Sequence, residues 1–405
     1  MRRRLPTVQP PTLRARKEAA PAMKAQKRRS TVEMPHGPFM RSMAASSGPS
    51  VAEKTERHRL FWERGEVSSP LVCFAVGAGP DAWSYWATNP GAAALWNRDE
   101  ILPEHVDPRA FVNGQRAYLE SVSGIDDAFR TAIPFASIPW MEAIIGCRMA
   151  STEAHFASRS FLKCIEEYEP ITFDADNSWA RKYVEFIEVY REAFGDAHPV
   201  GQSVLRGASD LLAALLGPQG AIEALMAAPT LARQVLTDLN VALDQFLRFQ
   251  QKFMPEFHGG YVIGQYELWS PGIPQRIQED NVALYSPELY RGFLKPLNVK
   301  LAKAVPYTLL HLHTSSLFLL DDFLDIPGVA VFQLSKDEGN RTWRDMRSQL
   351  RRVQESERCL LIKGRLEPED VAQLKQQLTP RGLCIEPVVG SVEEAKEMLP
   401  ALRSW

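Results

Sequence analysis

The chain is poor in cysteine and has no two cysteines at CxxC spacing, which argues against ribbon- and finger-type zinc sites. Its cysteines are odd in number and widely spaced along the sequence: Cys73, Cys147, Cys164, Cys359 and Cys384. We therefore expect no disulfide framework and a reducing compartment. The sequence also lacks an apolar run of about 18 residues, so a membrane protein is not expected. No GxGxxG opens a βαβ unit, which argues against a dinucleotide-binding sheet.

Positive and negative residues are nearly equal in number over the whole chain, but they are unevenly distributed along it. The 405 residues have a formal net charge of −2, with 45% hydrophobic and 24% charged residues, as in an ordinary globular protein. Residues 1–50 nevertheless hold eleven Lys or Arg against two acids, Glu18 and Glu33. The remainder of the chain is then near −11. The sequence thus divides into a basic N-terminal segment and an acidic body that is long enough to bury a sizeable core.

The basic segment, residues 1–50, is predicted to be a disordered tail, since it is rich in Pro, Ala and Ser. It has no interleaved aromatic residues, so nucleic-acid binding is not expected. Two alternatives stay open: an Arg-rich organelle-targeting peptide, or an extension upstream of a start at Met40 or Met43, which would leave residues 1–42 out of the mature protein. The apolar core of a secretory signal is missing, so we expect a cytoplasmic protein, with organellar targeting as the alternative.

Strand and helix patterns alternate from residue 51 to residue 405. Apolar strand candidates are at 71–76, 133–138, 198–205, 261–265, 308–313, 329–334, 359–362 and 383–388. Helical patterns occupy 51–64, 177–194, 210–216, 230–252, 287–304, 344–355, 368–377 and 391–399. About eight strands, most of them followed by helices, predict an α/β fold, and specifically a (β/α)₈ TIM barrel spanning 51–405.

Two imidazoles stand at the end of one of these strands, in Leu310-His311-Leu312-His313. Residues two apart in a strand face the same side, so both rings would point into one space. Neutral imidazoles held this way can bind a transition metal or position a proton. In a barrel, chemistry belongs at the carboxyl ends of the strands, which is where these histidines fall. They are the first place to look for function.

Other polar residues are predicted near strand ends. Glu267 follows the strand candidate at 261–265, and Cys384 and Glu386 lie within the last strand. Asp280, ahead of a Ser286-Pro287-Glu288 helix start, could orient a substrate or a histidine, or could simply cap a loop. A carboxylate such as Glu267 at the mouth would serve as acid, base or ligand. Cys384 alone is more readily explained as a small buried hydrophobe.

Several segments, in order, carry a family resemblance. These are Arg57 to Trp62 with Pro70 to Val72, Arg206 to Leu212, Asp280 with Ser286 to Glu288, His311 to His313, Gly364 to Glu369 and Arg381 to Leu383. On these motifs the chain resembles the uroporphyrinogen decarboxylase superfamily, which has a (β/α)₈ barrel. The superfamily includes tetrapyrrole decarboxylases and zinc-dependent, corrinoid-linked methyltransferases.

The resemblance implies a zinc site. The methyltransferase branch uses a His-x-Cys motif and a second Cys on the last strand. His311 matches the histidine, His313 stands where the first cysteine would be, and Cys384 or Glu386 lies near the second position. The resemblance thus implies zinc held by His311 and His313 with Cys384 or Glu386, and His311, Asp280 and Glu267 as catalytic candidates. Its implied reaction is methyl transfer from a corrinoid carried on a partner protein.

The decarboxylase branch matches less well. Its Arg-Gln-Ala-Gly-Arg segment has no counterpart after Pro70, Ser137 stands at the place of its catalytic aspartate, and its C-terminal Gly-His-Gly is missing. We therefore favour methyl transfer on a small-molecule or corrinoid substrate. Two alternatives stay open: decarboxylation of uroporphyrinogen or a related tetrapyrrole, which needs no cofactor, and a non-catalytic barrel that binds a ligand or a corrinoid protein.

Overall fold

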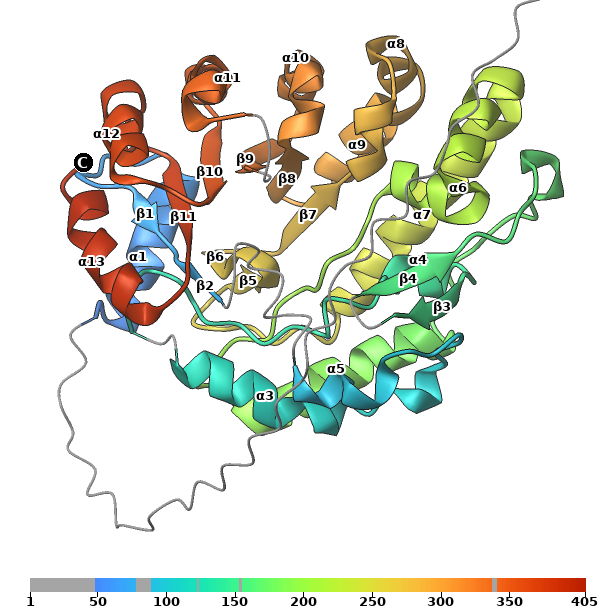
Figure 1. Ribbon diagram of the computed structural model, residues 1–405, viewed down its shortest axis with the longest axis horizontal. Helices are drawn as coiled ribbons and strands as arrows, with labels where there is room; N and C mark the ends of the chain where they lie inside the picture. Colours follow the sequence, from blue (N-terminus) through green and yellow to red (C-terminus); the bar gives the residue numbers. More distant parts are fainter. Residues whose placement is uncertain (1–47, 78–88, 122–123, 153–154, 337–340) are drawn as a thin grey trace, which may run out of the picture. The chain divides into compact units, whose positions relative to one another are not determined.

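A parallel β-sheet, formed mostly by strands from the second half of the chain, organises the fold (Figure 1). The computed structural model describes residues 48–77, 89–121, 124–152, 155–336 and 341–405, and the predicted tail at 1–50 lies almost wholly outside them. The strand order is β1-β11-β10-β9-β8-β7, with β2 also paired to β11. Every pairing in this sheet is parallel. The chain therefore has an α/β fold, as the sequence predicted.

The strands of the structure are β1 Leu71–Val72, β2 Ala75–Val76, β3 Arg148–Ser151, β4 Phe156–Arg159, β5 Tyr261–Ile263, β6 Leu268–Ser270, β7 Pro274–Gln278, β8 Tyr307–His313, β9 Val329–Ser335, β10 Cys359–Gly364 and β11 Leu383–Val389. The helices are α1 Val51–Trp62, α3 Pro108–Ser121, α4 Trp140–Ile144, α5 Ser178–Phe194, α6 Ala208–Ala227, α7 Pro229–Gln251, α8 Pro287–Leu289, α9 Lys295–Ala302, α10 Leu320–Leu324, α11 Trp343–Glu355, α12 Pro368–Gln377 and α13 Val392–Arg403.

Side chains alternate between two faces along β8 to β11. Leu310, Phe332 and Leu360 belong to the core that also contains residues of the outer helices, and helices α9 to α13 line this outer side in Figure 1. Leu309 and Val331, one residue away in each strand, belong to a second core on the inner side. The period of two therefore divides each strand into a helix-facing set and an inner set.

Capping residues explain where the predicted helices begin. Ser50 accepts from Glu53 N and forms a capping box at the start of α1. Asn177 caps α5 by accepting from Trp179 N and Ala180 N. The helix predicted to end at Gly217 does stop there, because Gly217 has a non-helical φ of 79°, and a second helical stretch then completes α6 to Ala227. The glycine absorbs the left-handed conformation, which lets the helix resume after it.

The fold is less regular than the predicted barrel. The predicted strand at 261–265 is the first arm of an antiparallel hairpin, β5–β6, outside the parallel sheet. The parallel strand is β7, which the prediction missed. Residues 133–138 and 198–205 contain no strand, only an isolated bridge between Ala132 and Val200. Single backbone bonds, such as Gly207 N to Gln278 O at 2.8 Å, connect this part to the sheet. The described residues thus form a parallel sheet and not a continuous closed ladder.

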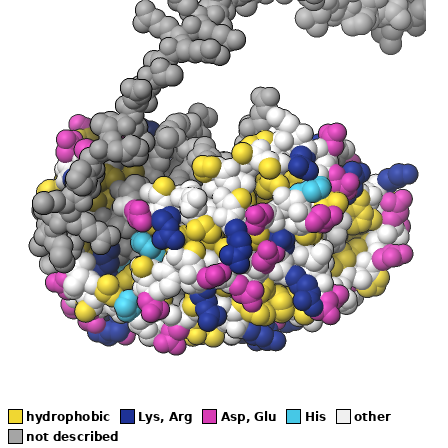
Figure 2. Space-filling model, turned by 90° about the horizontal axis from the view of Figure 1, so that it is seen from below, with side chains coloured by type: hydrophobic (Ala, Val, Ile, Leu, Met, Phe, Trp, Pro, Cys, Tyr) yellow, Lys and Arg dark blue, Asp and Glu magenta, His cyan; other side chains and the backbone are white. Residues whose placement is uncertain are grey.

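The surface gives little direction to a search for function. Acidic, basic and apolar side chains are interspersed on the face shown in Figure 2. Among the helices of the described ranges, none combines the length and the apolar character that a membrane crossing requires.

Candidate functional site

Strands β7 and β8 bring three metal-ligand side chains together. His311 and His313 share the inner face of β8, and Gln278 at the end of β7 is in register with His311, so Asp280 follows two residues later. The Nε2 atoms of His311 and His313 are 3.0 Å apart. Asp280 Oδ1 is 3.5 Å from His313 Nε2. The ligand atoms of the three residues all lie within 4.8 Å of one another. We call Asp280, His311 and His313 the histidine group.

The donor set of the histidine group fits a transition metal such as zinc. Two ligands bound at about 2.0–2.1 Å in tetrahedral geometry are roughly 3.3 Å apart, close to the observed separations. Imidazole nitrogen and carboxylate oxygen are both common zinc ligands, and three protein ligands leave one position for a substrate or water. The side chains of His313 and Asp280 are 31% and 36% exposed, so the group is accessible from one side.

His311 is the buried member of the group, and its environment keeps it neutral. Burial, followed by the charges of Arg276 and His313, lowers its pKa well below the ordinary value of 6.5. Its Nδ1 lies 2.8 Å from the Tyr266 hydroxyl and also hydrogen-bonds Gln333 Oε1. Arg276 Nε donates to the Tyr266 hydroxyl at 3.3 Å. A neutral ring fixed at Nδ1 has its Nε2 available as a ligand or a base.

Asp280 is held in place by Asp210 at the start of α6. Asp210 accepts from Asp280 N and Asn281 N, both at 2.9 Å, and from Asn281 Nδ2 at 2.7 Å. Burial, followed by the nearby charge of Asp280, raises the pKa of Asp210 to about 7. Gln278 Nε2 donates to the other carboxylate oxygen of Asp280. Asp280 was predicted either to cap a loop or to orient a substrate or a histidine, and in the structure it lies beside His313.

Glu267, a predicted catalytic residue, lies away from the histidine group. It is 6% exposed, pairs with Arg130 and accepts from Thr131 N at 3.2 Å. Burial raises its pKa, and Arg130 opposes the shift. The ion pair ties the β5–β6 hairpin to the segment between α3 and α4. Glu267 also lines a small cavity with Gln265, and its carboxylate is already matched by a buried cation.

Cys384 and Glu386, the predicted additional ligands, are on β11, with β10 and β9 between them and β8. Cys384 is completely buried beside Cys73, and burial raises its pKa. Glu386 accepts from Lys363 Nζ at 2.7 Å, and burial raises the pKa of Glu386 to about 7. Both face inward, as the sequence suggested. Neither contributes to the cluster of potential metal ligands that the described residues form.

Sequence reasoning missed the residues that hold the histidine group in place. Tyr266, Arg276 and Gln333 surround His311, and Asp210 holds Asp280. One signal was available: Gln333 is a polar residue in the apolar run Val329 to Leu334, at an inward-facing position. An amide inside a buried strand needs hydrogen-bond partners, which identifies such a residue as part of a polar network.

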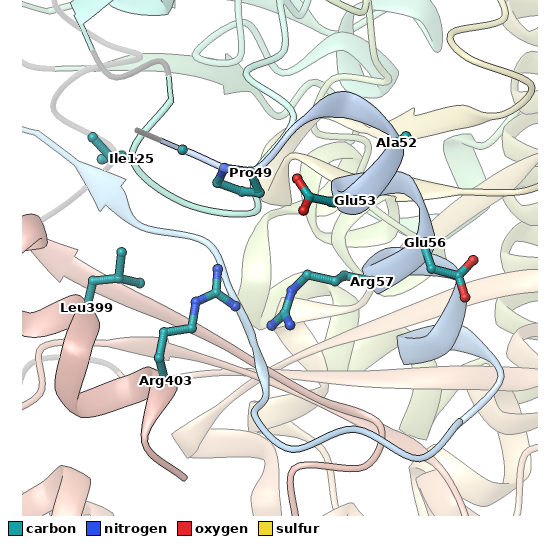
Figure 3. Close-up of a pocket in the computed structure, with 9 residues that line it drawn as sticks. Pro49, Ala52, Glu53, Glu56, Arg57, Ile125, Leu399 and Arg403 are labelled. Carbon is teal, nitrogen blue, oxygen red and sulfur yellow. The ribbon is translucent and has the colours of Figure 1, made fainter. Parts of the chain in front are cut away.

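A larger cavity, of about 690 Å³, lies between α1 and α13. Figure 3 shows Arg57 of α1 and Arg403 of α13 reaching toward each other across it. Both guanidinium groups pair with the buried carboxylate of Asp127, at 3.0 and 2.7 Å. The arginines are therefore matched by an acid of the fold, and the cavity contains no group of metal ligands.

Comparison with known proteins identifies the fold. A methyltransferase from Methanosarcina mazei has a similar structure, with a TM-score of 0.60 and 16% sequence identity over 86% of this chain and 98% of that protein. No family model matches the chain, and no curated protein is similar in sequence. Membership of the uroporphyrinogen decarboxylase superfamily therefore stays a prediction. At 16% identity, the similarity shows that this chain has the fold of a known methyltransferase.

Proposed function

We propose that the chain is a metal-dependent methyltransferase, in which Asp280, His311 and His313 hold zinc and a corrinoid on a partner protein supplies the methyl group. The convergence of these three side chains at the ends of β7 and β8 carries the proposal. The position of the site supports it, because enzymes of this architecture work at the carboxyl ends of the strands. The similarity of the fold to a methyltransferase also supports it.

The proposed reaction needs a nucleophile, such as a thiol, that loses its proton. Zinc bound at this site would favour the deprotonated form of a coordinated thiol. Transfer would form a sulfur–carbon bond and break the cobalt–carbon bond, whose electron pair stays on cobalt. His311 and His313 would contribute neutral nitrogen ligands and Asp280 one negative charge. His313 and Asp280 lie on the accessible side, where a thiol could enter and its proton could leave for solvent.

Metal analysis of the purified protein tests the proposal. We expect about one zinc per chain in the wild type and a loss of stoichiometric zinc in His313→Ala and Asp280→Asn, because each removes one of three ligands. His155→Ala is the matched control, since His155 is exposed and bonds only locally, to Thr152. Its zinc content should equal that of the wild type.

An activity assay completes the test. Zinc-loaded protein incubated with methylcobalamin and 2-mercaptoethanol should convert methylcobalamin to the demethylated corrinoid, and the His313→Ala protein should not. A wild-type protein that binds no zinc and leaves methylcobalamin unchanged even when zinc is supplied would overturn the proposal. In that case, conversion of uroporphyrinogen would favour the decarboxylase alternative, and inactivity toward both substrates would favour a binding protein.

A further inference from the structure

The directions of the hydrogen bonds around His311 follow from one residue that can only donate. Arg276 Nε donates to the Tyr266 hydroxyl oxygen, so the hydroxyl proton must point to a different acceptor. Tyr266 donates that proton to Gln333 Oε1 at 2.8 Å. Gln333 uses its amide nitrogen on Ser335 Oγ at 3.1 Å. In this orientation the amide oxygen faces His311, and it can accept a second hydrogen bond through its other lone pair.

This series of hydrogen bonds leaves one role for the Nδ1 atom of His311. Gln333 Oε1 is an acceptor and hydrogen-bonds Nδ1, so Nδ1 must donate. The neutral ring then has no proton on Nε2, the atom that faces His313 Nε2 at 3.0 Å. His311 is 4% exposed, and its ring is held at Nδ1 by Tyr266 and Gln333.

We infer that Tyr266 and Gln333 are positioning residues, which hold the proton of His311 on Nδ1 and so keep Nε2 free of a proton and aimed at the metal position. Neither touches the ligand side of the ring. Hydrogen bonds of this kind to the second nitrogen of a ligand histidine commonly change metal affinity by about 10- to 100-fold. The metal-binding part of this inference rests on the proposed function, whereas the position of the proton does not.

The two residues are not equivalent, because the Tyr266 hydroxyl can rotate. In Gln333→Met the hydroxyl loses its acceptor while still accepting from Arg276, and His311 Nδ1 is then its nearest acceptor, at 2.8 Å. Tyr266 would donate to Nδ1, so the ring proton would move to Nε2. In Tyr266→Phe, Gln333 still accepts from Nδ1, so the proton should stay there. The inference thus predicts opposite tautomers for two neighbouring substitutions.

Nitrogen NMR of metal-free protein labelled with ¹⁵N-histidine measures the tautomer directly, since the shifts of protonated and bare ring nitrogens differ widely. His311→Gln identifies the His311 signals. We expect the proton on Nδ1 in the wild type, Tyr266→Phe and Gln333→Glu, and on Nε2 in Gln333→Met. A wild-type proton on Nε2, or an unchanged tautomer in Gln333→Met, would overturn the inference.

Zinc affinity, measured by competition with a chromophoric chelator, is the second readout. Gln333→Met should bind zinc about 10- to 100-fold more weakly than the wild type, and Gln333→Glu should restore affinity because a carboxylate also accepts from Nδ1. Gln275→Met is the matched control: Gln275 is 3% exposed on neighbouring β7, but donates to Thr308 Oγ1, away from the site. It should leave both readouts unchanged. A wild type that binds no zinc would remove the proposed function, and the tautomer would still be decided by NMR.

Discussion

Two groups of polar residues lie on the inner side of the fold, and they differ in how their charges are matched. The histidine group, Asp280, His311 and His313, brings two rings and one carboxylate together without a Lys or Arg among them. The second group, which we call the ion-pair group, consists of two networks: Arg130 with Asp126 and Glu267, and Lys363 with Glu386. There, each acid meets a cation supplied by the chain itself.

The difference separates structural polar residues from candidate functional ones. A buried carboxylate that already has a cation is needed by the fold, because removing either partner leaves an uncompensated buried charge. Two imidazoles that face each other gain little from their contact, and their preferred partner is a metal ion or a proton. On this criterion we assign Glu267 and Glu386 to the fold and propose a functional role for the histidine group. The predictions below test this division.

The largest effect is expected from Arg130→Met. The substitution leaves Asp126 and Glu267 without their shared cation in a site where the arginine side chain is only 3% exposed. Breaking a buried ion pair from one side costs about 3–5 kcal/mol, and urea unfolding should show a loss of stability of that size. Arg148→Met is the matched control, because its pair with Glu100 has 64% and 45% exposed side chains. The control should change stability by no more than about 0.5 kcal/mol. Equal losses in the two variants would contradict the division.

A somewhat smaller effect is expected in the pH dependence of Glu386→Gln. Burial raises the pKa of Glu386 to about 7 in the folded protein, from a reference value of 4.5. Between these values the folded carboxyl keeps a proton that the unfolded chain has released, so the wild type loses stability as the pH rises. The loss amounts to up to about 3 kcal/mol.

Glutamine at position 386 does not ionise, so this loss should disappear in the variant. The difference in unfolding free energy, variant minus wild type, should therefore rise between pH 4.5 and 7.5, whatever the constant effect of losing the Lys363 contact. Glu355→Gln, at an exposed side chain that pairs with Arg351, should leave the pH profile parallel to that of the wild type. Parallel profiles for Glu386→Gln as well would show that the fold does not raise the pKa of this carboxyl group.

The same contrast explains how much of the fold could be predicted. Strands β8 to β11 were predicted because each is a run of apolar residues followed by a helical pattern, as in Thr308 to His313. Strand β7, Pro-Gln-Arg-Ile-Gln, has one long aliphatic residue, since its inner positions Arg276 and Gln278 serve the polar network. A strand whose inner face is polar loses the hydrophobic signal on which the prediction depends.

The site was predicted in part for a related reason. The spacing of His311 and His313 fixed their common direction, because alternation within one strand is a local property. The relation of these histidines to Cys384 and Glu386 is not local. Glu386 is level with Lys363 in the register, and Lys363 with Ser335, so β10 and β9 separate the two ends of the predicted ligand set. A sequence motif gives the position of a residue along its own strand, but the distance between residues on different strands depends on the order of the strands in the sheet.

The smallest effect is expected from Cys384→Ala, which should leave zinc affinity within about twofold of the wild type. Cys384 is 0% exposed and lies beside Cys73, and burial raises the pKa of its thiol, which disfavours the thiolate that zinc requires. In the folded protein only Cys164, the one exposed cysteine, should react rapidly with a thiol reagent, and all five should react in denaturant. Added zinc should not change the folded-state count. A tenfold loss of affinity in Cys384→Ala would show that the metal also contacts β11, which is separated from β8 by β10 and β9, and would contradict the confinement of the metal to the histidine group.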